Sequence, residues 1–212
     1  MSRSIAYGLG STAAERRCLA RLDRPDRIQA FLDRIPYSTD HCYRSPRRVL
    51  RDRRAHCFDG ALFAAAALRH AGFRPLVVDL RAVRDDDHVI AVFRRDRHLG
   101  AVAKSNMSGL RWREPIHRSL RELVLSYFDD YFSVEGRRTL RSYSRPLDLD
   151  TLPFDWTTCD ERLDEVATKL DALPHRALLS PAMARRLLPV DRRSFDAGML
   201  GADDAGLYHP SR

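Results

Sequence analysis

The sequence predicts an α+β fold in which one Ala-rich helix packs on a small antiparallel sheet, with further helices around them. Apolar residues recur at helical spacing from 57 to 69. Three short apolar runs, 76–80, 89–93 and 99–103, follow at once and are separated by charged turns, which is typical of strands. Only a few residues join the last two runs, which favours an antiparallel hairpin. Because the runs are almost continuously apolar, we expect cover on both faces of the sheet, with the helix on one of them.

The predicted helix has one apolar stripe and clear ends. Cys57, Ala61, Ala64 and Leu68 follow one another at steps of four, three and four residues, and glycine and proline residues follow the helix. Two shorter helices precede it: one over 26–35, and one that opens at the Ser-Pro pair of residues 45 and 46. The stripe begins at Cys57, so this thiol lies at a helix N-terminus.

Downstream of residue 106 the patterning is weaker. Helical spacing predicts helices over 120–128 and 163–173, with a proline-broken region at 145–153 between them, and a helical piece at 183–188. We therefore divide the chain into an N-terminal arm (1–22), a single domain (23–180) and a C-terminal tail (181–212). Within the domain we expect a core at about 46–106 and a helical extension at 117–175.

Composition limits the partners of the chain. The length of 212 residues and a hydrophobic content of 44% suit one sizeable core. The net charge is +8, but only two of the 37 basic residues are lysine, and the remaining 35 arginines are spread along the chain among acidic residues. This dispersion, without a basic and aromatic platform, argues against a nucleic-acid partner. Oligomeric state is not predicted.

Targeting and redox signals point to a reduced compartment. No apolar run reaches the ~18 residues of a membrane-spanning helix, and charges at 15–17 interrupt any secretory signal, so we expect a cytoplasmic protein without a membrane span. The four cysteines, Cys18, Cys42, Cys57 and Cys159, are too scattered for a disulfide framework, which predicts free thiols.

A cysteine attacks as thiolate, and a helix N-terminus favours that form because its free amide groups and dipole stabilise negative charge. Cys57 begins the Ala-rich helix, so it is the candidate nucleophile. The base must come from another segment, and a strand packed on the helix would hold an imidazole rigidly. His88 opens the second predicted strand and is the candidate base.

The order of Cys57, helix, strand, the segment Asp-His-Val-Ile-Ala-Val at 87–92, and a third strand ending at Lys104-Ser105-Asn106 resembles the transglutaminase-like superfamily over about residues 46–106. Segments at 113–115, 121–123 and 126–128 are similar to uncharacterised bacterial members. The resemblance implies a papain-like α+β core, no cofactor, and a Cys-His-Asp triad acting on peptide or isopeptide amides of a protein substrate by proteolysis, deamidation or transfer to an amine.

The third member of the triad departs from that pattern. The family places an aspartate about sixteen residues after the histidine, where this chain has Lys104. We predict Asn106 in this role, because an amide oxygen can orient an imidazole as in papain-like triads. Ser105 and the aspartates Asp86 and Asp87 remain alternatives.

Other interpretations of these residues compete with the enzyme. The missing aspartate allows a catalytically idle papain-like scaffold used for protein binding, because fold does not fix chemistry. The pairs His41-Cys42 and His56-Cys57 supply four formal zinc ligands, but adjacent ligands do not have the two-to-four-residue spacing of a zinc knuckle. We therefore predict no metal.

Overall fold

The chain has an α+β architecture built on one antiparallel sheet. The computed structural model describes residues 8–209, so the first seven residues of the predicted arm and the last three of the tail lie outside the described residues. The sheet has seven strands in the order β4-β3-β2-β1-β5-β7, with β6 also paired to β1. The strands are β1 (Leu76–Ala82), β2 (His88–Arg95), β3 (His98–Val102), β4 (Arg113–His117), β5 (Leu140–Ser144), β6 (Leu147–Asp148) and β7 (His175–Ala177).

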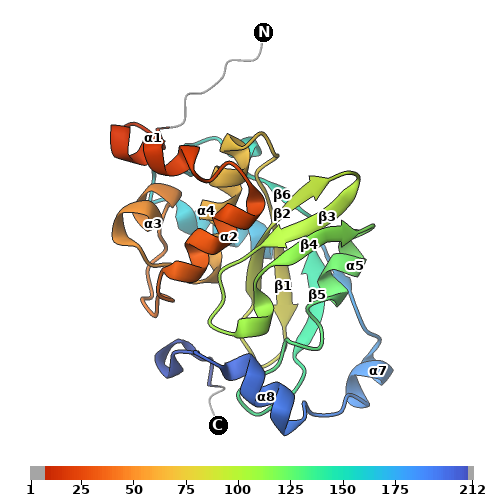
Figure 1. Cartoon of the computed structure of the whole chain (residues 1–212). Coiled ribbons are helices and arrows are strands. Elements are labelled where there is room, and N and C mark those ends of the chain that lie inside the picture. The colour runs from red at the N-terminus through yellow and green to blue at the C-terminus, as the bar shows by residue number, and fades with distance from the viewer. Residues whose placement is uncertain (1–7, 210–212) are drawn as a thin grey trace.

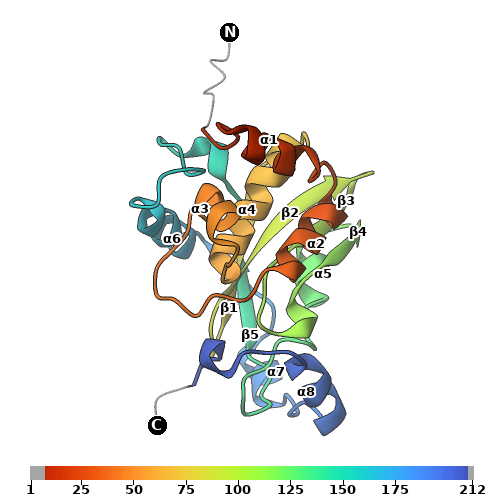
Figure 2. The ribbon, with the colours of Figure 1, turned by 60° about the vertical axis from the view of Figure 1, so that its left-hand side comes forward.

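Helices gather on both sides of this sheet (Figures 1 and 2). The α-helices are α1 (Ala13–Ala20), α2 (Pro25–Arg34), α3 (Pro46–Asp52), α4 (Cys57–His70), α5 (Leu120–Leu125), α6 (Leu163–Asp171), α7 (Pro181–Arg185) and α8 (Arg192–Met199), and the 3-10 turns are η1 (Ser108–Leu110), η2 (Leu149–Thr151) and η3 (Asp204–Gly206). No helix in the described part of the chain has the length and apolar character needed to cross a membrane.

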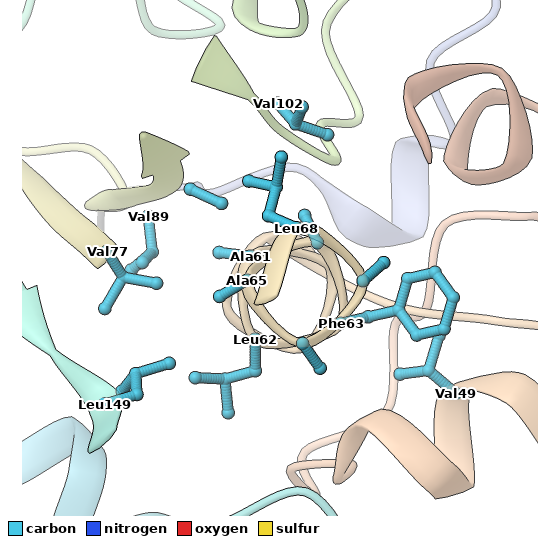
Figure 3. Close-up of a cluster of buried hydrophobic side chains, with 14 of the residues drawn as sticks. Val49, Ala61, Leu62, Phe63, Ala65, Leu68, Val77, Val89, Val102 and Leu149 are labelled. Carbon is cyan, nitrogen blue, oxygen red and sulfur yellow. The ribbon is translucent and has the colours of Figure 1, made fainter. Parts of the chain in front are cut away.

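Helix α4 is the central element of the larger core. Its residues from 58 to 68 are all buried, and Leu62, Phe63 and Leu68 are fully inaccessible. Fully burying a side chain of this size stabilises the fold by about 1.5–3 kcal/mol. Figure 3 shows Val77 and Val89 of the sheet and Val49 of α3 turned toward this helix. The predicted helix, and its packing on the three predicted strands, are therefore confirmed.

The alternation of side chains along β2 separates two cores. Val89, Ala91 and Phe93 pack with α4, whereas Ile90 and Val92 lie in a second cluster, with Leu123 of α5, on the other face. Because successive residues of a strand point to opposite faces, His88 belongs to the second face. This alternation decides on which side of the sheet the predicted base lies.

Small residues let α4 approach the sheet closely. A Cβ placed on Gly60 would lie 2.3 Å from the Lys104 Cβ, so any larger residue at position 60 would force helix and sheet apart. The helix begins with His56 as N-cap, whose Nδ1 accepts hydrogen bonds from the Phe58 and Asp59 amides. The sequence therefore fixes both the start of α4 and its distance from β3.

The extension at 117–175, predicted to be helical, has mixed structure. It contains α5 and α6, but β5 and β6 lie between them, and β4 and β7 begin or follow it. These four strands were not predicted. With two and three residues, β6 and β7 are too short to show the alternation that marks a strand in sequence. The five-residue strands β4 and β5 contain mostly polar residues, so they lack the apolar run that marked the predicted strands. The sheet is consequently larger than expected.

The predicted tail carries two short helices, α7 and α8, and the 3-10 turn η3. Neither α7 nor α8 contains a buried residue. Figures 1 and 2 both place α8 and the chain that follows it at one end of the sheet. This is the end at which β2 begins and β3 finishes, as the contact of Ser108 with Ala197 shows.

A candidate thiol site at the start of helix α4

Cys57 is the first residue of α4, and its half-buried sulfur lies against the start of β2. The thiol donates a weak hydrogen bond to the Asp87 carbonyl, with 3.8 Å between Sγ and O. The backbone N–H groups of Phe58 and Val89 point at the sulfur and favour the thiolate, but burial has the larger effect and raises the pKa of the Cys57 thiol to about 11. In this arrangement the thiol is neutral at pH 7.

The Tyr37 hydroxyl is a neighbour of the thiol that sequence reasoning missed. It lies within hydrogen-bonding reach of both the backbone and the side chain of Cys57. A bridge between Tyr37 and Ala55 holds it there, and burial raises the pKa of its phenol far above the usual value. The neutral hydroxyl can donate a hydrogen bond to negative charge at the sulfur or at a bound carbonyl. Its only sequence signal is its position just after a helix-ending proline.

His88 begins β2 and is held by one backbone carbonyl. Its Nε2 lies 2.8 Å from the Leu110 carbonyl oxygen. A carbonyl can only accept, so Nε2 carries the proton and Nδ1 is the basic nitrogen. The ring packs edge-on against Tyr127 and Tyr131, with 6.4 Å between ring centroids in each pair. Burial lowers the pKa of His88 to about 4, so the imidazole is neutral at pH 7.

Cys57 and His88 border the same small cavity of about 60 Å³, together with Tyr37, Ser105 and Asn106. They do not form a hydrogen bond with each other in the described part of the chain. The sulfur donates to the Asp87 carbonyl just before β2, whereas the imidazole Nε2 donates to the Leu110 carbonyl. The structure therefore brings the predicted nucleophile and base to one cavity without joining them.

The residues predicted for the third position have other partners. The Asn106 Nδ2 donates to the Asp203 carbonyl, and its Oδ1 accepts from the Asp203 N–H, both at 2.8 Å. Ser105 Oγ accepts from the Met107 amide at 3.0 Å. Neither side chain contacts the imidazole in the described structure; the group that holds His88 is the Leu110 carbonyl.

The aspartates before His88 also bond elsewhere. Asp87 Oδ1 accepts from the Ala82 amide at 2.7 Å, and Asp85 Oδ2 accepts from the Thr139 hydroxyl at 2.6 Å. Asp86 lines the small cavity that Cys57 and His88 both border. Burial raises the pKa of all three carboxyls, and for Asp86 the charge of Asp87 adds to this effect.

Lys104, which lies where the resemblance led us to expect an aspartate, has a structural role. Its Nζ donates to the carbonyls of Leu32 at 2.9 Å and Ile35 at 2.6 Å, which belong to the last turn and C-cap of α2. A helix C-terminus has unpaired carbonyls and attracts a cation, so the buried ammonium caps α2. Burial lowers the pKa of Lys104.

Buried charge below the N-terminus of α4 is a second feature that the sequence did not reveal. Asp59 is fully buried; its Oδ1 accepts from the Arg44 amide at 2.8 Å, and its Oδ2 lies 3.7 Å from Arg44 Nη1. The His56 Nε2 lies 3.4 Å from Asp59 Oδ1. Burial raises the pKa of Asp59 to about 7 and lowers that of His56 to about 4. This network fixes the residue before the thiol.

A larger groove of about 470 Å³ opens beside the cavity and is also lined by Cys57 and Tyr37. Asp79 borders it on the α4 face of the sheet; this buried carboxylate is paired with His175, with 2.8 Å between Oδ2 and Nε2. The described residues contain no group of three or more His, Cys, Asp or Glu side chains placed to hold a metal ion. The groove therefore leads to a thiol, with carboxylates around it.

No protein-family model and no curated protein matches this sequence.

The atoms of the site themselves indicate its possible chemistry. A half-buried thiol at the N-terminus of a 14-residue helix has amide donors directed at it, and a basic imidazole nitrogen borders the same cavity. A thiol and a base in this relation can perform nucleophilic acyl transfer once they come into contact.

Proposed function

We propose that this chain is a cysteine-nucleophile acyl-transfer enzyme acting on peptide or isopeptide amides, with a papain-like arrangement of Cys57 and His88. The observation that carries the proposal is that both side chains border one cavity at the N-terminus of α4, with the His88 Nε2 proton held by Leu110 so that Nδ1 is basic. The chain order of thiol helix and imidazole strand, which resembles the transglutaminase-like superfamily, supports the same proposal.

In the proposed reaction His88 Nδ1 takes the thiol proton and the Cys57 sulfur attacks the amide carbonyl, forming a C–S bond. The tetrahedral intermediate collapses, the C–N bond breaks, and the imidazolium returns its proton to the leaving amine. Water or a second amine then attacks the thioester. Because the sulfur and the imidazole each bond a backbone carbonyl and not each other, the two side chains must come into contact for the proton transfer.

The Leu110 carbonyl takes the orienting role that an aspartate or asparagine has in related triads. It holds the Nε2 proton and so selects the tautomer with a basic Nδ1, but it carries no full charge to stabilise the imidazolium. We therefore expect slower turnover than in a triad with aspartate. Asn106, which bonds the C-terminal segment, is not assigned this role.

A second function, a catalytically idle scaffold for protein binding, is favoured by the charge states. The pKa of the thiol is raised to about 11 and that of the imidazole is lowered to about 4, which opposes the thiolate–imidazolium pair. The two functions differ in one measurable property: only the enzyme has a Cys57 whose reactivity depends on His88.

The test is acylation by p-nitrophenyl acetate, a small activated ester. The thiol displaces p-nitrophenolate, and mass spectrometry locates the acetyl group on individual cysteines. Cys42, which is exposed and has no resolved role, is the internal reference in the same molecule. We expect Cys57 to be acylated faster than Cys42 although it is less accessible, and we expect His88→Gln to remove this advantage.

Glutamine is the informative substitution because its amide can still donate to Leu110 while it cannot accept a proton at neutral pH. Cys57→Ser and Cys159→Ser are the matched controls: the first should abolish the fast phase and the second should leave it unchanged. If Cys57 reacts no faster than Cys42, or if its rate is the same in His88→Gln, the enzyme proposal fails and the scaffold stands.

A further inference from the structure

The C-terminal segment of residues 190–209, here called the strap, passes over the entrance to the thiol site. Its residues Gly206, Leu207 and Tyr208 line both the small cavity and the larger groove, and Cys57 lines both as well. Figures 1 and 2 show the strap returning along the end of the sheet below α4. The strap therefore forms part of the wall of both the cavity and the groove that lead to Cys57.

The strap is held next to the thiol by its backbone. The Asn106 side-chain amide bonds both the N–H and the C=O of Asp203, each at 2.8 Å. Asp203 has extended backbone angles, with φ −90° and ψ 117°. An amide that pairs with both backbone groups of one extended residue recognises a polypeptide independently of its side chain. Asn106 is thus placed as a receptor for an extended peptide at the mouth of the site.

The next contact reaches the residue beside the sulfur. A Cβ placed on Gly206 would lie 3.0 Å from both Asn106 Nδ2 and the Tyr37 ring, so the strap backbone is closely packed against these two side chains. Tyr37 in turn is within hydrogen-bonding reach of Cys57. A substrate peptide that reaches Cys57 through the small cavity would meet the same two side chains, because both line it, so substrate and strap compete for one place.

The strap is attached weakly to the rest of the fold. Neither α8 nor η3 contains a buried residue, and Leu200 is 80% exposed. Its apolar contacts with the rest of the fold include Phe195 against Phe132, whose ring centroids are 5.5 Å apart, the close approach of Gly198 to the same Phe132 ring, and Val190, which is 9% exposed. Segments with so little buried apolar surface open at low free energy while the core stays folded.

We propose that the strap is an autoinhibitory segment that occupies the path of an extended polypeptide substrate, with Asn106 as the backbone receptor for both. That the blocked path is a substrate path rests on the proposed function, whereas the restriction of access to the Cys57 thiol does not. It also names the substrate class: an extended chain with a small residue against Tyr37, followed by bulky apolar residues at the places of Leu207 and Tyr208.

The experiment measures alkylation of Cys57 by iodoacetamide relative to Cys42, in the full-length chain that carries His88→Gln. In this background no proton transfer to His88 operates, so the relative rate reports access alone. Asn106→Ala removes two hydrogen bonds, and we expect Cys57 to react about 5- to 100-fold faster relative to Cys42. Asp204→Ala, an exposed change in the same segment, is the control and should leave the ratio unchanged.

A second variant guards against loss of fold. Asp203→Pro removes one N–H that bonds Asn106, lies on an exposed residue and leaves Asn106 itself intact. It should also increase Cys57 alkylation. A synthetic peptide of residues 200–209, added to the Asn106→Ala variant at millimolar concentration, should compete for the open groove and slow alkylation, whereas a scrambled peptide should not.

If the Cys57 alkylation rate is unchanged in both Asn106→Ala and Asp203→Pro, the proposal that the strap is autoinhibitory is wrong, whatever the result with p-nitrophenyl acetate. Conversely, if Cys57 alkylation is faster in these variants but its acylation does not depend on His88, the autoinhibitory strap is supported and the enzyme proposal is rejected. Slower acylation of Cys57 in Asn106→Ala with His88 intact would instead return Asn106 to the catalytic group and would also overturn its assignment as a strap anchor.

Discussion

Placing an aspartate at position 104, where the superfamily that the sequence resembles has one, should damage the fold and leave the thiol unactivated. Lys104 is 6% exposed and its ammonium donates to the carbonyls of Leu32 and Ile35 at the end of α2. In the continuing alternation of β3, Lys104 faces α4 and α2, whereas His88 lies on the opposite face of the sheet. An aspartate here would meet two carbonyl oxygens and would not reach the imidazole.

The magnitude follows from these contacts. Loss of two hydrogen bonds from a charged donor costs about 1.5–3 kcal/mol each, and a buried carboxylate without a partner costs about 3–5 kcal/mol. Since these contributions overlap, we expect Lys104→Asp to lower the free energy of unfolding by about 4–6 kcal/mol. For a chain of this size that corresponds to a fall in Tm of about 10–20 °C. Lys104→Met keeps the volume, so about half this loss is expected.

The assay is urea denaturation followed by circular dichroism, repeated at pH 5 and pH 8. An unpaired buried carboxylate costs most when it is ionised, so the gap between Lys104→Asp and Lys104→Met should be wider at pH 8. Equal stability of the two variants, or faster acylation of Cys57 in Lys104→Asp, would refute the reasoning that position 104 serves α2 rather than the imidazole.

Three further outcomes follow from buried groups. The pKa of His88 is about 4 in the native protein and about 6.5 in the unfolded state, so between these values the unfolded state binds more protons. The native protein therefore loses stability on acidification. In urea titrations its stability advantage over His88→Gln should shrink by about 3 kcal/mol from pH 7 to pH 4. His175→Ala removes the nearer partner of Asp79 and leaves the Arg81 guanidinium 3.9 Å from its Oδ2. Because burial raises the pKa of Asp79 to about 6, the loss of stability in urea titrations should be larger at pH 8 than at pH 5, on the order of 3 kcal/mol when the carboxyl is ionised. Gly100→Ala would place a Cβ 2.6 Å from the Phe93 ring and should lower stability by about 1–3 kcal/mol in thermal denaturation, with equal stability contradicting the close approach of β3 to its neighbours.

Local sequence patterns were enough to predict the helix and strands in the middle of the chain. The helix that starts at Cys57 and the three strands that follow it have strong periodicity and clear end signals, and all four elements are present. The strands from 113 onward were missed because they are either very short or mostly polar, and they take their place from pairing with distant strands. β5, for example, is held by β1 and β7, which are more than 30 residues away on either side.

The candidate site likewise has some features that the sequence predicted and others that it did not. Sequence alone placed a cysteine at a helix N-terminus and a histidine at a strand start, and both are where the pattern put them. It could not show that Asn106 bonds a segment 97 residues away, because that contact depends on where the strap returns. For the same reason the sequence did not show that Tyr37 and the Leu110 carbonyl belong to the site: Tyr37 is placed by a bridge to Ala55, and the carbonyl is a backbone atom.

By itself, then, the sequence determined the α+β class, the central helix and the residue types at its N-terminus, since these depend on the periodicity and capping of neighbouring residues. The tertiary structure decided which face of β2 His88 takes, which group bonds its imidazole, and which distant segment borders the cavity at the thiol. Each of these depends on contacts between residues far apart in the chain, whose free energies are set by burial and by backbone partners that no local pattern records.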